Sequence, residues 1–316
     1  MAQLDHEPKL LTDEQIDTVI KRTADAFKNQ LRAPLLATPA DVGLAFEEVT
    51  FPALDGVPIE AWFIPKPNSD KLIIVNHPRG FNRYGMPSHL EPWKSMLAAS
   101  GNDFEVNFVS DYRILHDAGY NVLTYDLRNH GHSGVSNGLV TSGIFESRDV
   151  IGSLQYARSR EDLSGMIIGL FTRCLGCNSA IFAISSYPEH FVGVRCMVGA
   201  QPLSPRFYHE SQLALVGVPS DRMDELDRAI KINTSFSFDQ LSPVKPAKDV
   251  TIPTFIYQVR EDSTTKPFDV QTIFDSIAAE EKELFWIEGT TRRWDGYAYF
   301  SRDPQRMLGW FEKYMR

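Results

Sequence analysis

The sequence contains few cysteines, no long apolar run and no excess of basic residues. Three cysteines, Cys174, Cys177 and Cys196, occur among 316 residues. This is too few for a disulfide framework and indicates a reducing compartment. No apolar stretch approaches the roughly 20 residues that cross a bilayer, and the N-terminal segment is too acidic and mixed for a signal peptide. A formal charge of −9 argues against a nucleic-acid surface. We therefore expect a cytoplasmic protein that binds neither nucleic acid nor a membrane.

Cys174 and Cys177 have the C-x-x-C spacing of redox and metal sites. A redox pair usually opens a helix near the start of a thioredoxin-like unit, whereas this pair lies in the middle of a much larger chain. A zinc site would need a second C-x-x-C or a pair of histidines at matching spacing, and the sequence has neither. We therefore favour neither reading and expect no metal and no cofactor.

The length and composition are ordinary for a globular protein. With 43% hydrophobic and 23% charged residues, the chain can bury one large core or two modest ones. We divide it into an N-terminal helical extension over 1–43, a core over 44–202 and 251–316, and a lid insertion over 203–250. A second insertion, 87–106, is long for a strand-to-helix connection, and such insertions commonly form lids.

Strand and helix patterns alternate along most of the core. Residues 12–31 predict a capped amphipathic helix that packs on the outside of the domain. Residues 44–51 and 59–64 predict an antiparallel hairpin. A hairpin followed by repeated strand–helix units predicts an α/β fold, with a mostly parallel central sheet and helices on both faces. The other predicted strands are 72–75, 121–125, 166–171, 193–199, 253–259 and 283–288, and the other predicted helices are 108–118, 143–159, 176–186, 220–232, 268–279 and 303–315.

The stretch 166–180 combines an apolar run, a sharp break and a helix start rich in small residues. The break reads Thr172-Arg173-Cys174-Leu175-Gly176. Strand, tight turn and helix form the context in which the G-x-S-x-G elbow holds a nucleophile. Gly176 supplies the small residue that such a turn needs, whereas Thr replaces the first glycine and Cys174 replaces the serine. Cys174 is thus the candidate nucleophile, and the other reading is a small residue buried at a tight turn.

Three further segments carry a resemblance to the α/β-hydrolase superfamily over roughly residues 44–316. Residues 76–80 (NHPRG) resemble the loop that gives one oxyanion-hole amide, and residues 126–134 (DLRNHGHSG) resemble the segment D-x-R-G-H-G-x-S. Residues 258–262 (QVRED) lie where that superfamily has H-G-x-x-D. The resemblance implies the α/β-hydrolase fold, Asp262 as the triad acid, and backbone amides of Arg79 and Leu175 as oxyanion donors.

The catalytic histidine of that superfamily has no counterpart here. No histidine follows His209, and the segment that should hold it reads Gly289-Thr290-Thr291-Arg292-Arg293-Trp294. We expect Arg292 in its place, paired with Asp262 as a catalytic group or as a structural ion pair. Arg292 or Arg173 would then favour the Cys174 thiolate, together with the helix dipole. Because arginine cannot transfer protons, good leaving groups suit such a site best.

Other side chains have a functional and a packing interpretation. His77 could turn into the pocket, where it would substitute for the missing proton-transfer group or bind substrate, but we favour a ring that hydrogen-bonds backbone. His130 and His132 are expected to stabilise the turn after their strand, and His209 is a weak candidate base in the insertion. The aromatic residues just past Arg292, among them Trp294 and Tyr297, are candidate walls of a substrate pocket, although we favour packing.

Two functional hypotheses follow from these residues. The first is an enzyme that acts on a small-molecule ester, thioester or lactone through Cys174, similar to dienelactone-hydrolase-type proteins, which also carry a cysteine. The second is a non-hydrolytic lyase, cyclase or binding protein that holds an anionic or enolate-like ligand at Arg292 and the oxyanion hole, since arginine suits anion binding. The oligomeric state stays open, with a homodimer among the candidates.

Overall fold

The computed structural model describes residues 11–28 and 30–316. Residues 1–10, which carry most of the segment interpreted as no signal peptide, lie outside the described part, as does Asn29. None of the helices within the described ranges is long and apolar enough to span a membrane.

An eight-stranded sheet forms the centre of the molecule, in the order β1-β2-β6-β3-β7-β8-β9-β10. The predicted hairpin is present, because β1 and β2 pair antiparallel, and β2 also pairs antiparallel with β6. The six strands from β6 to β10 in this order all run parallel. The strands are β1 (Glu47–Pro52), β2 (Pro58–Ile64), β3 (Lys71–Val75), β6 (Asn121–Tyr125), β7 (Ile167–Arg173), β8 (Val194–Ala200), β9 (Thr254–Val259) and β10 (Lys282–Ile287).

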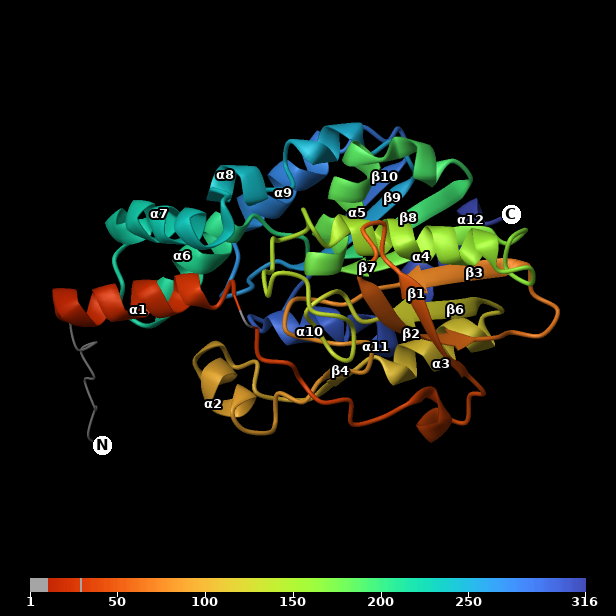
Figure 1. The fold of residues 1–316 in the computed structure, drawn as a ribbon, viewed down its shortest axis with the longest axis horizontal. Helices are drawn as coiled ribbons and strands as arrows, with labels where there is room; N and C mark the ends of the chain where they lie inside the picture. Colours follow the sequence, from red (N-terminus) through yellow and green to blue (C-terminus); the bar gives the residue numbers. More distant parts are fainter. Residues whose placement is uncertain (1–10, 29) are drawn as a thin grey trace.

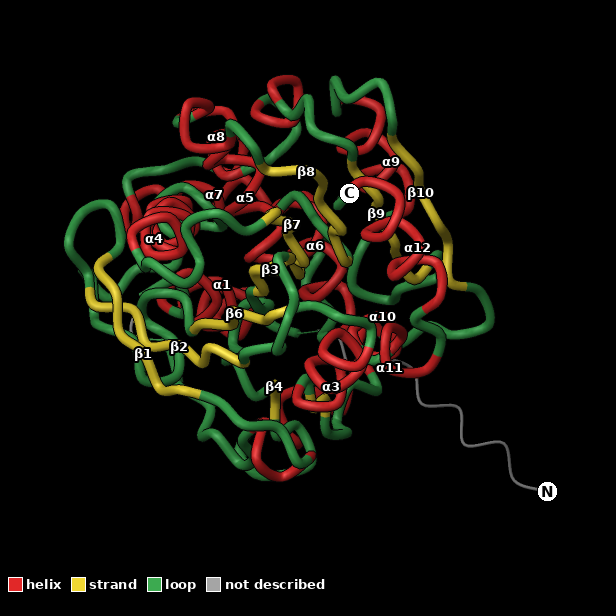
Figure 2. The backbone as a smooth tube through the Cα atoms, turned by 90° about the vertical axis from the view of Figure 1, so that its right-hand side faces the viewer, coloured by secondary structure: helices red, strands yellow, loops and turns green. Residues whose placement is uncertain are grey.

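Helices cover both faces of this sheet (Figure 2). Side chains alternate along β3, so that Leu72 and Ile74 belong to one apolar cluster while Ile73 and Val75 belong to the other. The first cluster includes α4 (Ser147–Ser159), α5 (Leu175–Ser186) and α9 (Pro267–Ser276), and the second includes α3 (Val109–Asp117), α10 (Arg293–Tyr297), α11 (Tyr299–Arg302) and α12 (Gln305–Tyr314). The predicted architecture of a sheet between two helical layers is confirmed.

The two insertions have structure of their own. Residues 203–250, expected to be irregular apart from one helix, form α6 (Pro205–Leu215), α7 (Met223–Thr234) and α8 (Phe238–Leu241). The other insertion lies between the short paired strands β4 (Gly85–Met86) and β5 (Val106–Asn107), and contains α2 (Trp93–Leu97). Single 3₁₀ turns complete the described elements: η1 (Pro39–Val42), η2 (Ala98–Ser100), η3 (Pro188–Phe191), η4 (Ser220–Arg222) and η5 (Pro246–Asp249).

Helix α1 (Asp13–Asp25) packs on the 203–250 insertion. It begins at a capping box in which Thr12 and Gln15 satisfy each other's backbone N–H groups, as the sequence predicts. Its buried residues Ile16 and Ile20 join an apolar cluster with Leu226 and Ile230 of α7. Figure 1 shows α1, α6 and α7 side by side at one end of the molecule. The extension and the insertion therefore form one helical cap.

The segment after β6 is a buried, hydrogen-bonded turn. The Asp126 carboxylate accepts hydrogen bonds from the backbone N–H groups of Arg83 and His132, and it pairs with the Arg83 guanidinium at 2.5 Å. A Cβ on Gly131 would lie 2.1 Å from that carboxylate, so only glycine fits. His130 donates or accepts at both ring nitrogens within this region, as expected for a residue that holds the turn.

Candidate active site

Cys174 lies at a strained bend between β7 and α5. Its backbone angles are φ 46° and ψ −108°, a region that residues with a side chain rarely adopt and that often marks functional sites. Its N–H donates to the Ala200 carbonyl oxygen at 2.8 Å. The bend matches the geometry expected for a nucleophile elbow, and the residue is 8% exposed.

Gly176 and Asn76 explain how the bend is held. A Cβ on Gly176 would lie 1.9 Å from the Asn76 side-chain oxygen. Asn76 donates to the Gly176 carbonyl at 3.2 Å and accepts from the Arg173 N–H at 3.3 Å, so one amide joins the end of β3 to both sides of the elbow. Thr172, in place of the first glycine, is accommodated because its hydroxyl donates to the Val198 carbonyl at 3.2 Å.

Asp262 pairs with Arg293 rather than with Arg292. The Arg293 Nη1 lies 2.7 Å from the Asp262 Oδ2, and both side chains are buried. Arg292 is 48% exposed and pairs with Asp295 at 2.9 Å, with its guanidinium over the Phe104 ring. The predicted contact between Asp262 and Arg292 is therefore wrong by one residue, because α10 begins at Arg293 and directs that side chain inward.

Arg293 has partners at all three guanidinium nitrogens. Besides Asp262, it donates from Nε to the Tyr297 hydroxyl at 2.7 Å and from Nη2 to the Gln201 carbonyl at 2.5 Å. Burial would lower the pKa of Arg293, but Tyr297, Cys174 and Asp262 around it raise the pKa well above its ordinary value. Arg293 is thus a fixed cation behind the elbow, not a proton shuttle.

The Tyr297 hydroxyl stands between Arg293 and the elbow. Burial raises the pKa of Tyr297 well above its ordinary value, against the opposing charge of Arg293, and a hydrogen bond with the Cys174 side chain adds to the rise. The phenol therefore stays protonated and can donate to the sulfur. Hydrogen bonding and an ion pair link Tyr297 through Arg293 to Asp262, and the Cys174 thiol acts on the pKa of Tyr297 at the other end.

The Asp262 carboxylate is fully engaged. Its Oδ1 accepts from the N–H and hydroxyl of Thr264, both at 2.8 Å, and its Oδ2 accepts from the Thr265 hydroxyl at 3.0 Å besides Arg293. With 4% of its surface exposed, it acts on the elbow only by orienting Arg293.

The amides expected to form the oxyanion hole are free. The N–H of Leu175, at the first position of α5, and the N–H of Arg79, in the loop after β3, donate to no acceptor within residues 11–28 and 30–316. The first N–H groups of a helix lack intrahelical acceptors. Both loops follow strands that end at the same edge of the sheet, which suits the predicted pair of donors.

The side chain of Arg79 ties its loop to the segment after α1. It donates from Nη2 to the Ala26 carbonyl at 2.7 Å and from Nε to the Gln30 side chain at 3.2 Å, and its guanidinium lies 4.4 Å from the centre of the Phe27 ring. Gln30 in turn contacts the His130 ring at 2.8 Å. The helical cap is thus connected to the loop that carries the oxyanion amide.

Two predicted substrate contacts are corrected by the structure. His77 donates or accepts at both nitrogens, with the Pro78 carbonyl at 2.8 Å and the Leu127 N–H at 2.9 Å, and it is buried. The favoured backbone-bonding interpretation of His77 therefore holds, and its substrate role does not. Arg173 points away from the thiol, because its guanidinium pairs with Asp111 at 2.7 Å and packs over the Phe171 ring.

Trp294 is an anchor for the 87–106 insertion. Its indole N–H donates to the Ser88 hydroxyl at 2.7 Å, and its backbone N–H donates to the Asn102 side-chain oxygen at 2.9 Å. The ring packs between Phe81 and Tyr297, with centroid distances of 5.1 and 5.5 Å. Trp294 therefore supports Tyr297 and is packed, as favoured from the sequence.

The remaining candidates from the sequence are Cys177 and His209, and both are packed in the interior. Burial raises the pKa of Cys177 to about 12, and its sulfur packs beside Gly199, which disfavours a redox pair. Burial lowers the pKa of His209 to about 3, and its ring packs beside Phe27 and Phe238. Within the described residues, no cluster of potential ligands could hold a metal ion.

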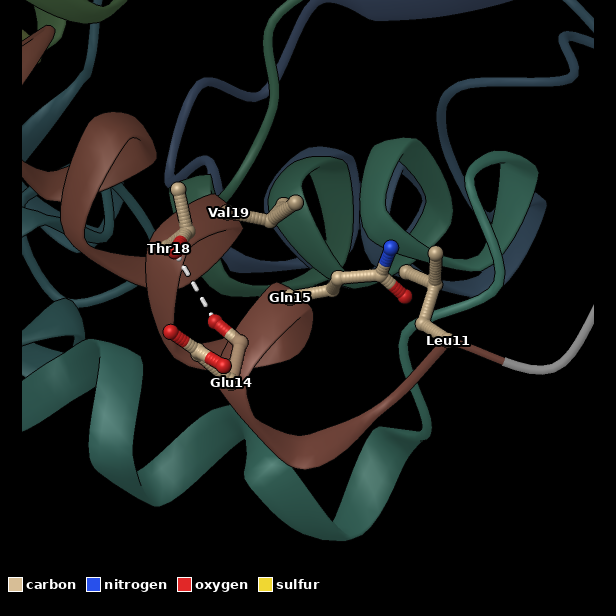
Figure 3. A pocket seen from close by; sticks show the side chains of 5 residues that line it. All are labelled: Leu11, Glu14, Gln15, Thr18 and Val19. Atoms are coloured by element: carbon tan, nitrogen blue, oxygen red, sulfur yellow. Dashed lines mark hydrogen bonds between the residues drawn. The ribbon is translucent and has the colours of Figure 1, made fainter.

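A shallow hollow of about 420 Å³ lies elsewhere, on the outer face of α1. Figure 3 shows it lined by Leu11, Glu14, Gln15, Thr18 and Val19, and the Thr18 hydroxyl there bonds the Glu14 backbone. No candidate catalytic residue lines this hollow.

Sequence reasoning missed two residues of the site. Arg293 is adjacent to the predicted Arg292, and its spacing of four residues from Tyr297 is the signal that both share one helical face. Tyr208, on α6, comes from the insertion; burial raises its pKa, and Arg293 and Cys174 are among the neighbouring groups that act on it. Nothing in its sequence context indicated that the cap would bring it to the elbow.

This is the α/β-hydrolase fold: it has the strand order, the bend at Cys174 and the loops that follow β3 and β7 at one edge of the sheet. Solved structures agree. Pyrococcus furiosus esterase Pf2001 matches with a TM-score of 0.67 at 19% identity, over 92% of this chain and 98% of that chain. The Penicillium α/β-hydrolase GrgF matches with a TM-score of 0.56 at 14% identity, over 86% and 99%. Acylaminoacyl peptidase from Pyrococcus horikoshii matches with a TM-score of 0.58 at 13% identity, over 86% of this chain and 42% of that chain.

Sequence relatives add little to the fold. No family model matches the chain. Two Escherichia coli proteins, each described as an uncharacterized 31.7 kDa protein in the traX-finO intergenic region, are 23% identical over 242 residues. The match covers 63% of this chain and 82% of each relative.

Proposed function

We propose that this protein is an acyl-transfer enzyme of the hydrolase type that uses Cys174 as its nucleophile. Its substrate is a small-molecule thioester, ester or lactone. The fold supports this proposal, because its structural relatives include esterases and a peptidase. The acyl carbonyl would lie at the elbow, with its oxygen toward the N–H groups of Leu175 and Arg79.

The observation that carries the proposal is the environment of the Cys174 sulfur. Cys174 lies at a strained bend and acts on the pKa of Tyr297, whose hydroxyl accepts a hydrogen bond from Arg293, the buried partner of Asp262. Backbone strain of this kind is kept where function requires it. A purely structural cysteine would need neither the strained bend nor the two free amides beside it.

Each residue of the chain has a distinct role. The Tyr297 hydroxyl stabilises the thiolate by donating to it, and charge-assisted hydrogen bonds of this kind are about twice as strong as neutral ones. Arg293 fixes the phenol oxygen by donating to it from Nε. Asp262 fixes Arg293, and the N-terminus of α5 adds a favourable dipole. The thiolate attacks the carbonyl carbon, the two amides hold the oxyanion, and the leaving group departs as the carbonyl re-forms.

The alternative of a non-hydrolytic protein that holds an anion at Arg292 has less support. Arg292 contacts Asp295 and Phe104, and Arg293, the arginine at the elbow, is 1% exposed with a partner at every nitrogen. Neither guanidinium is presented as an anion clamp.

Alkylation and acylation of the purified protein test the proposal. Iodoacetamide near neutral pH, followed by peptide mass spectrometry, should label Cys174 in preference to Cys177, and p-nitrophenyl acetate and acetyl thioesters should form an adduct there. Cys174→Ala should abolish the adduct, whereas the matched variant Cys177→Ala should retain it. Unlabelled Cys174, or equal adduct formation in Cys174→Ala, would refute the proposal.

A further inference from the structure

The titratable side chains around the Cys174 sulfur are all protonated at neutral pH. Burial raises the pKa of Tyr297 and of Tyr208, and burial raises the pKa of Cys177 to about 12. The Cys174 thiol acts on the pKa values of Arg79, Cys177, Tyr208, Arg293 and Tyr297. The two arginines among them cannot accept a proton.

Three groups of the site region that could accept a proton are already engaged. The Asp262 carboxylate receives five hydrogen bonds, from Gln258, Thr264, Thr265 and Arg293. His77 and His130 use both ring nitrogens on neighbouring groups. The fourth candidate, His209, has its pKa lowered to about 3 by burial and packs beside Phe27 and Phe238, so it is a weak base. Among these four groups of the described residues, none is suited to act as a general base.

This arrangement treats water and thiols differently as acyl acceptors. Water becomes a good nucleophile only when a base removes its proton, and such assistance typically contributes about 10²–10⁴-fold. A thiol ionises on its own near pH 8.5, so a useful fraction is already thiolate at neutral pH. A thiolate is also a stable leaving group that needs no proton, unlike an alkoxide.

From this asymmetry we infer that the enzyme transfers an acyl group from one thiol to another. The inference rests on the proposed function, since it needs Cys174 as nucleophile. In the first step the Cys174 thiolate forms a bond to the acyl carbon of R–CO–SR′, and R′S⁻ leaves. In the second step an acceptor thiolate R″S⁻ attacks the Cys174 thioester, giving R–CO–SR″ and restoring the Cys174 thiolate.

Each half-reaction consumes one thiolate and produces one, so no proton moves at the enzyme in a full cycle. Tyr297 remains a hydrogen-bond donor throughout, first to the nucleophile and then to the departing Cys174 sulfur. The free amides of Leu175 and Arg79 serve the oxyanion in both directions. The site thus matches a donor and an acceptor of the same chemical class.

The test follows the fate of the acyl-enzyme. The full-length protein is loaded with hexanoyl-N-acetylcysteamine thioester, freed of excess reagent, and observed by intact-protein mass spectrometry. Its discharge is compared in buffer, in 2-mercaptoethanol and in ethylene glycol, which differs from the thiol only in its nucleophilic atom. The same acylated protein unfolded in urea gives the uncatalysed exchange rate, and Cys177→Ala serves as the matched variant.

We expect the adduct to persist in buffer and in ethylene glycol. With 2-mercaptoethanol it should discharge about 10²-fold faster, at the low end of what a general base contributes, and yield the mixed thioester. Discharge in buffer as fast as in thiol, or native exchange no faster than that of unfolded protein, would overturn the inference and leave the proposed function standing. Failure of any donor to acylate Cys174 would overturn both.

Discussion

The Arg293 Nε donates a hydrogen bond of 2.7 Å to the hydroxyl of Tyr297, one helical turn further along α10. The Cys174 thiol contributes to the raised pKa of the same hydroxyl, and the other end of the guanidinium pairs with Asp262. The arginine and the tyrosine together occupy the space between nucleophile and acid, where the superfamily resemblance implies a histidine. Under the proposed function, this pair would hold charge in place without moving a proton, unlike the histidine of a hydrolytic triad.

Tyr297→Phe removes the hydroxyl that faces the sulfur and keeps the ring. A hydrogen bond to a charged group is worth about 1.5–3 kcal/mol, so loss of the hydroxyl should slow Cys174 alkylation by about tenfold or more. The rate of alkylation with iodoacetamide at pH 7 measures the loss. Tyr299→Phe is the control, because the Tyr299 hydroxyl donates to Asp303 outside the elbow. Identical rates for wild type and Tyr297→Phe would contradict the proposed hydrogen bond.

Arg293→Met and Arg292→Met separate the two adjacent arginines. Removing Arg293 leaves a buried carboxylate without its cation, which typically costs about 3–5 kcal/mol. Arg292 is half exposed, and Asp295 keeps Arg302 at 2.8 Å, so its loss should cost under about 1 kcal/mol. Urea unfolding of both variants at pH 7 measures the difference. Equal losses, or a larger loss for Arg292→Met, would show that the assignment of the buried pair is wrong.

Gly176→Ala tests the close approach at the elbow. The new Cβ would lie 1.9 Å from the Asn76 oxygen, so either the amide or the bend must move, and overpacking of this kind costs about 1–3 kcal/mol. Gly165→Ala is the matched control, because a Cβ there meets nothing within 4 Å. Thermal unfolding should show a lower midpoint for Gly176→Ala alone. A shared midpoint would mean that the elbow tolerates a side chain at this position.

Asp269→Asn should change how stability depends on pH. Burial raises the pKa of Asp269 to about 6, against the opposing hydrogen bond from Ser204. The ordinary value is 3.8, so between about pH 4 and 6 the folded protein binds more protons than the unfolded chain, and the free energy of unfolding falls as pH rises.

Asparagine resembles the protonated acid and removes this dependence. The variant should therefore be more stable than wild type at pH 8, by on the order of 1–3 kcal/mol, and equal to it near pH 4. Urea unfolding at both pH values provides the measurement. A variant that is less stable at pH 8 would show that the ionised carboxylate stabilises the α9 N-terminus.

Arg79→Met keeps the backbone N–H of the oxyanion loop but removes the contacts of its side chain with Ala26, Phe27 and Gln30. Acylation of Cys174 should slow by about tenfold, less than the 10²–10³-fold that loss of an oxyanion donor costs. The acylation rate with a thioester is measured by mass spectrometry. Arg32→Met is the comparison, since Arg32 also binds backbone carbonyls, at Gly131 and Ser133, but not the oxyanion loop. An equal effect of both variants would indicate general destabilisation.

The sequence predicts the fold well because local patterns and fold-specific motifs agree. Alternation in β3 and the capping box at Thr12 depend on near neighbours, and both appear in the structure. The D-x-R segment is informative since Asp126 and Arg128 are buried with fixed partners: Arg128 pairs with Asp149 at 2.8 Å and Asp55 at 2.7 Å. Because each of these side chains has fixed, buried partners, few other residues could replace Asp126 or Arg128.

The site was harder to predict, because it depends on which way individual side chains point rather than on the order of motifs along the chain. Which of Arg292 and Arg293 turns inward is decided by where α10 begins, and that start depends on contacts of Trp294 with the distant residues Ser88 and Asn102. Tyr208 is brought to the elbow by the cap, whose docking is set by long-range packing with α1. Local sequence carries no information on either event.

The helical cap also has a consequence for biosynthesis. Helix α1 leaves the ribosome long before α7, yet the apolar faces of the two cover each other. Ile16 and Ile20 therefore lack their α7 partners until most of the chain has been translated. Completion of the cap is therefore a late event in synthesis, because it needs α7.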